Sequence, residues 1–190
     1  MSLFELYLKL GFKHIIDING YDHIVFILAL CAGYIYNQFK KILILVTAFT
    51  VGHSITLALS TLKIITFPSD IIEFLIPVTI FITALSNLLG SSRTKGWFIY
   101  FVTLFFGLIH GLGFSNYLKE LLGKESNIIT PLLAFNVGLE LGQILIVAAN
   151  FLSLFIAMVV FKVSHKNWRT FISGAAFGIA AILIIENKIW

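Results

Sequence analysis

The feature that most constrains this chain is a series of apolar stretches about as long as a helix that crosses a lipid bilayer. A spanning helix needs roughly 20 apolar residues to cover the hydrocarbon core. Six stretches reach or approach this length: residues 21–36, 42–62, 71–89, 97–117, 131–161 and 168–185. Hydrophobic residues make up 59% of the sequence and charged residues only 12%, which excludes an ordinary soluble domain.

These stretches predict an all-α fold. We expect a polytopic membrane bundle of about six transmembrane helices, forming a single transmembrane domain over residues 1–190. Residues 3–17 precede the first span and are predicted to form a short amphipathic helix. As a helix, the stretch 131–161 would be about 45 Å long, so we expect it to tilt, bend or protrude from the membrane.

Basic residues predict how the chain is oriented, because Lys and Arg are retained on the cytoplasmic side of a membrane. The segments after the first, third and fifth stretches share a basic character without acidic residues: Lys40, Lys41, Arg93, Lys95, Lys162, Lys166 and Arg169. We therefore expect a multi-pass protein of the cell membrane, surrounded by lipids, with its N-terminus and C-terminus outside. This orientation also accounts for the net charge of +4, and we predict no nucleic-acid partner.

Several ionisable side chains interrupt the apolar stretches, although a charged group near mid-membrane costs roughly 2.5–3.5 kcal/mol. They are Asp22, His23, His53, His110 and Glu140. Because successive spans run in opposite directions, all five fall at a similar depth in the outer half of the bilayer. We predict that they meet around one centre, whose ligand compensates the cost of burying them.

Helical periodicity supports this convergence. One stripe of the stretch 131–161 is polar at a spacing that matches 3.6 residues per turn: Asn136, Glu140, Gln143 and Asn150. His53 shares a helix face with Ser54. His110 is flanked on its own face by Gly107 and Gly111, and such small residues let another helix approach closely.

A purely structural role is the alternative for each polar residue, because hydroxyl and amide groups commonly join membrane helices. We favour that structural role for Ser54. At the site, Ser54 would add only a secondary polar contact. The two histidines and the glutamate of the second, fourth and fifth stretches together favour a functional site. Asn136 and Gln143 would supply further oxygens or orient the ligands by hydrogen bonds, and Glu73 would line a path for the ion.

The available donor atoms narrow the choice of metal. The single cysteine is Cys31 and the two methionines are Met1 and Met158, which does not suit a copper(I) site. Imidazole nitrogens and carboxylate oxygens suit Ni(II), Co(II), Zn(II) or Fe(II). We therefore predict a bound divalent metal ion, nickel, cobalt or zinc, which the identity of the ligands alone does not distinguish.

Four motifs follow one another along the chain. They read GYDHIVFILAL at residues 20–30, TAFTVGHSITLAL at 47–59, FGLIHGLGFS at 106–115 and FNVGLELGQ at 135–143. In this order they resemble the HupE/UreJ family, which is associated with nickel and cobalt uptake for hydrogenase and urease. The resemblance implies a permease, and it implies metal handling by the residues that match the family's pattern: His14, Asp22, His23, His53, His110 and Glu140.

Two other functions would use the same residues. An intramembrane metal-dependent hydrolase, acting on a lipid or lipid-linked substrate, would use Asp22 or His23 as general base beside a metal-bound water. An enzyme is the less favoured reading because the sequence contains no H-E-x-x-H or G-x-S-x-G motif. A haem-binding electron carrier with His53 and His110 as axial ligands comes third. The oligomeric state stays open, a homo-oligomer included.

Overall fold

The structure is a computed structural model that describes residues 2–90, 97–122 and 128–189. Every regular element within these ranges is helical, which confirms the predicted all-α fold. In chain order the elements are α1 (Leu3–Ile15), α2 (Asp22–Ala32), the 3-10 turn η1 (Tyr36–Gln38), α3 (Phe39–Thr61), α4 (Ser69–Leu88), α5 (Trp97–Gly113), α6 (Ser115–Leu122), α7 (Ile129–Val159) and α8 (His165–Glu186).

The helices divide into two classes by length. Four segments are long and apolar enough to cross a membrane: Tyr36–Thr61, Ser69–Leu88, Ile129–Val159 and His165–Glu186. The other two predicted spans correspond to the shorter apolar helices α2 and α5. The chain is therefore a membrane protein by the character of its helices, built from four long helices and two short apolar ones within the described ranges.

One predicted span is divided in the structure. The stretch 97–117 divides into α5 and α6, because the helix stops at Gly113 and a new one starts at Ser115. The Ser115 hydroxyl donates to the carbonyl oxygen of Leu112 at 2.8 Å, which satisfies one of the free carbonyls at the end of α5. The long helix α7 agrees with the prediction, and Pro131 lies in its first turn, where a proline is tolerated.

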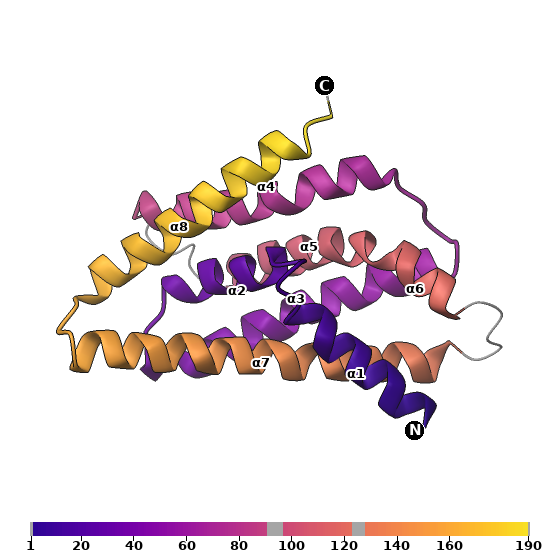
Figure 1. Cartoon of the computed structure of the whole chain (residues 1–190), viewed down its shortest axis with the longest axis horizontal. Helices are drawn as coiled ribbons and strands as arrows, with labels where there is room; N and C mark the ends of the chain where they lie inside the picture. Colours follow the sequence, from indigo (N-terminus) through magenta and orange to yellow (C-terminus); the bar gives the residue numbers. More distant parts are fainter. Residues whose placement is uncertain (1, 91–96, 123–127, 190) are drawn as a thin grey trace.

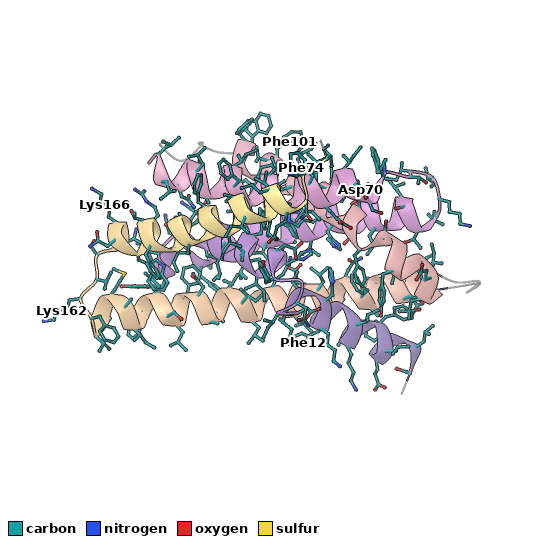
Figure 2. The ribbon with its side chains drawn as sticks, turned by 45° about the horizontal axis from the view of Figure 1, so that its top comes forward. Phe12, Asp70, Phe74, Phe101, Lys162 and Lys166 are labelled. Carbon is teal, nitrogen blue, oxygen red and sulfur yellow. The ribbon has the colours of Figure 1, made fainter. Side chains whose placement is uncertain are left out.

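The apolar helices alternate in direction. Figure 1 shows that α2, α4 and α7 finish at the same end of the molecule, where α3, α5 and α8 begin. Lys162 and Lys166 lie at this end, and Asp70 lies toward the opposite end (Figure 2). Of the basic residues that the sequence assigned to one side of the membrane, Lys162 and Lys166 therefore lie together at one end of the bundle, and Arg93 and Lys95 lie outside the described residues.

Glycines bring two pairs of helices into backbone contact. A methyl group added at Gly107 of α5 would overlap the carbonyl oxygen of Phe49 in α3, and one at Gly111 would overlap that of His53. Between α1 and α7 the same close approach occurs at Gly11 and Gly138. Because backbone contact leaves little freedom to slide, these glycines fix the register of each helix pair.

Candidate metal centre

Four histidines from four helices meet in the interior of the bundle. His14 comes from α1, His23 from α2, His53 from α3 and His110 from α5. The ring centroid of His23 lies 4.8 Å from that of His14, 5.2 Å from that of His110 and 6.0 Å from that of His53. The potential ligand atoms of His14, His23 and His53 all lie within 4.8 Å of one another. We call these four residues the histidine centre.

The ring nitrogens of the histidine centre are buried and largely unpartnered. His53 and His110 are fully buried and His23 is 4% exposed. In the described part of the chain, no hydrogen-bond partner reaches Nε2 of His14, His23 or His110, or either ring nitrogen of His53. A buried polar atom without a partner costs about 1–3 kcal/mol, so five such atoms at one point make this the candidate ligand site of the chain.

Two of these rings are oriented by acceptors that leave the other nitrogen free. Nδ1 of His23 donates to the Asp22 carboxylate at 3.0 Å, and Nδ1 of His110 donates to the carbonyl oxygen of Phe106 at 2.8 Å. Because a carboxylate or a carbonyl only accepts, each ring has a proton on Nδ1, and in the neutral imidazole the lone pair is then on Nε2. This carboxylate–imidazole arrangement is how proteins commonly orient metal-binding histidines.

The spacing fits a first-row divalent ion after a small adjustment. Bonds from such an ion to imidazole nitrogens are about 2.0–2.1 Å, so two ligands are at most about 4.2 Å apart. The ligand atoms of the three-histidine group lie within 4.8 Å of one another, so the side chains would have to move closer together to bind one ion. His110 stands beside the group through its contact with His23 and offers a fourth nitrogen.

Phenylalanine rings enclose the histidine centre, a feature that the sequence analysis missed. The ring centroid of Phe114 lies 4.0 Å from that of His14, and Phe135 stacks on His53 at 6.4 Å. On the other side, Phe49 and Phe26 lie 5.0 and 5.2 Å from His110. With 19 phenylalanines in the chain, composition gives no hint of which ones matter. The usable signal is that several of them lie three or four residues from a histidine on the same helix.

Glu140 is not part of this group of ligand atoms. Its carboxylate accepts a hydrogen bond of 2.7 Å from the Thr47 hydroxyl and lines a groove between α3 and α7, together with Asn136 and Ser54. We call this the α3–α7 groove. The face of α7 that meets the histidine centre presents Phe135 instead. The structure therefore separates Glu140, Asn136 and Ser54 from the four histidines with which the sequence grouped them.

Gln143 lies deeper on the same helix, where it is fully buried. Its side-chain oxygen accepts a hydrogen bond of 2.6 Å from the Thr50 hydroxyl of α3. This contact joins α7 to α3, one turn from His53. The structure thus gives Gln143 a link between the helices, as polar side chains commonly provide in membranes.

Two openings reach the histidine centre from one end of the bundle. One has a volume of about 670 Å³ and is lined by His14, Asp17 and Asn19. The other, of about 450 Å³, is lined by Asn19, Asp22 and Glu73. Glu73 thus lines the same opening as Asp22. Carboxylates line both openings and attract cations, and Lys13 offsets the charge of Asp17 at the first one.

Comparison with known proteins gives one match. The family model described as HupE / UreJ protein matches residues 1–187, nearly the whole chain. No curated protein and no solved structure matches. The chain therefore belongs to the HupE/UreJ family, which is associated with nickel and cobalt transport.

Proposed function

We propose that this HupE/UreJ protein is a permease for a divalent transition metal, nickel or cobalt before zinc, in the cell membrane. The observation that carries the proposal is the set of five unpartnered imidazole nitrogens at the histidine centre. Imidazole donors without a thiolate suit these borderline cations. In our proposal the centre lies in the outer half of the bilayer, with both termini outside.

The ion would reach the centre through the two openings. Asp17, Asp22 and Glu73 would concentrate cations there by their negative charge. The ion would then exchange water for the nitrogens of His14, His23 and His53. Asp22 serves this step by holding the His23 ring with Nε2 free, a positioning role that its hydrogen bond supports.

The driving force would come from the membrane. An inside-negative potential of 100 mV favours inward movement of a divalent ion by roughly 4–5 kcal/mol. Because each imidazole must lose its proton to bind a metal, acid would compete with the ion. The purified protein is therefore expected to retain less metal as the pH is lowered, because protons displace the ion from the imidazole nitrogens.

The proposal is tested by the metal content of detergent-purified protein, followed by uptake of nickel into liposomes. Wild type is expected to retain a divalent metal, and His53→Ala and His110→Ala to lose it. His165→Ala is the matched control, because His165 begins α8 at the far end of the bundle. A wild-type protein without metal would refute the shared site. Tight binding without uptake would instead favour the intramembrane hydrolase.

A further inference from the structure

A separate cavity lies on the other side of the histidine centre from the two openings. Its volume is about 300 Å³ and it is enclosed by α2, α4 and α5. Its near end is lined by Phe26 and Phe106, and its far end by Gly33, Asn87 and Phe98, where α2 and α4 end and α5 begins. We call it the α2–α4–α5 cavity.

On two helices, the residues between the histidine centre and this cavity follow the same order. On α2, His23 is followed at +3 by Phe26 and at +7 by Leu30. On α5, His110 is preceded at −4 by Phe106 and at −7 by Thr103. Because α2 and α5 run in opposite directions (Figure 1), both helices present a ligand, then a phenylalanine, then a cavity residue.

Phe26 separates the two spaces. Its side chain is 1% exposed, and its ring centroid lies 5.2 Å from that of His110. It stacks on Phe49 at 4.8 Å and meets the edge of Phe106 at 6.2 Å. The same ring therefore touches the histidine centre on one side and lines the cavity on the other.

Most of the cavity lining is apolar, and its polar groups among the described residues are neutral. The hydroxyls of Thr83 and Thr103 donate to carbonyl oxygens of their own helices at 2.8 Å, which leaves oxygen lone pairs available. A volume of about 300 Å³ corresponds to roughly ten water molecules, enough for a hydrated divalent ion. Neutral oxygens hold such an ion only weakly, which suits release more than storage.

We propose that the α2–α4–α5 cavity is a hydrated vestibule through which a divalent cation passes after leaving the histidine centre, with Phe26 and Phe106 as the barrier between them. The inference rests on the proposed permease function. It adds a second compartment to the path of the ion. This compartment would hold a hydrated divalent cation, and Phe26 and Phe106 would close it.

Water access to the cavity is tested with a cysteine at Thr103, which is buried and lines it. In a Cys31→Ser background, Thr103→Cys is expected to react with a positively charged, membrane-impermeant methanethiosulfonate in liposomes. Ser153→Cys is the control. Ser153 lies on the outer surface of the membrane-spanning helix α7, where a cysteine would face lipid and react slowly with a charged reagent. Reaction at Thr103→Cys at least tenfold faster than at Ser153→Cys supports the vestibule. Equal, slow reaction with the charged reagent but fast reaction with an apolar maleimide would overturn it and indicate a lipid chain in the cavity.

Passage of the ion is tested by filling the cavity. Thr83→Phe places a large side chain in the lining without touching the histidine centre. Nickel uptake into liposomes is expected to fall at least tenfold, while the nickel content of the purified variant stays at the wild-type level. The retained metal also shows that the variant folds. Undiminished uptake by the variant would contradict the vestibule but not the permease function. A purified wild-type protein that contains no nickel would contradict the permease function itself.

Discussion

The histidine centre and the α3–α7 groove both introduce ionisable side chains into an apolar bundle, and they do so in opposite ways. At the centre, buried imidazole nitrogens lack partners within the described residues. In the groove, the Glu140 carboxylate is half-buried and already accepts a hydrogen bond from Thr47. Both regions belong to motifs that resemble one family. Their hydrogen bonding separates a cluster of imidazole nitrogens without partners from a carboxylate that has one, although the side-chain oxygen of Asn136 in the groove is also unpartnered among the described residues.

The largest effect is expected from His53→Ala, because both ring nitrogens of His53 are unpartnered and the ring is fully buried. We expect the dissociation constant for nickel to rise at least about 100-fold, as loss of a ligand commonly does. Equilibrium dialysis with radioactive or spectroscopically detected nickel measures it. An affinity within threefold of wild type would remove the distinction between the two regions.

A smaller loss is expected from Asp22→Asn, which keeps the shape of the side chain but removes its charge. The variant weakens the bond that orients His23, and such changes typically cost 10–100-fold in metal affinity. The metal should still bind with the same stoichiometry, because all four histidines remain. A changed stoichiometry would mean that Asp22 binds the ion itself.

Helix packing should matter at the centre more than elsewhere. Gly111→Ala would push α5 away from His53 of α3, and overpacking of this kind costs about 1–3 kcal/mol. We expect weaker nickel binding, by about tenfold, and a lower thermal midpoint in detergent. Gly174→Ala is the control, because no atom lies within 4 Å of a methyl group built there. Equal effects of the two substitutions would contradict the assigned contact.

The smallest effect on metal affinity is expected from Glu140→Gln. Its partner Thr47 still finds an oxygen to donate to, and the four histidines are untouched. We expect nickel affinity within about threefold of wild type. A loss of tenfold or more would show that Glu140 joins the ligands when the metal binds, as the sequence motif implied, and would erase the contrast between the two regions.

The elements that depend on local sequence were predictable. Hydropathy and periodicity indicated the helices, including the unusual length of α7, and the alternation of spans brought His23, His53 and His110 to one depth. His14 was expected at the site only by resemblance, because α1 reaches the other helices through its contacts with α7. Those contacts are set by Gly11 and Gly138, which lie far apart in the sequence.

The sequence also did not indicate which residues of α7 contact which neighbouring helix. One polar stripe of a helix can meet two neighbours at once, and the stripe alone does not say which residue faces which. In the structure Phe135 faces the histidine centre while Glu140 faces Thr47. The phenylalanine barrier and the cavity behind it depend on four helices together, so no single segment indicates them.

The contact between α1 and α7 can form only after α7 has been synthesised. The ribosome completes α1 before α7, because α2 to α6 lie between them in the chain. Until α7 arrives, Gly11 has no backbone to pack on and His14 has no fixed position. A chain that stops before α7 would therefore hold metal poorly, and the capacity to bind would itself report that α7 has packed on α1.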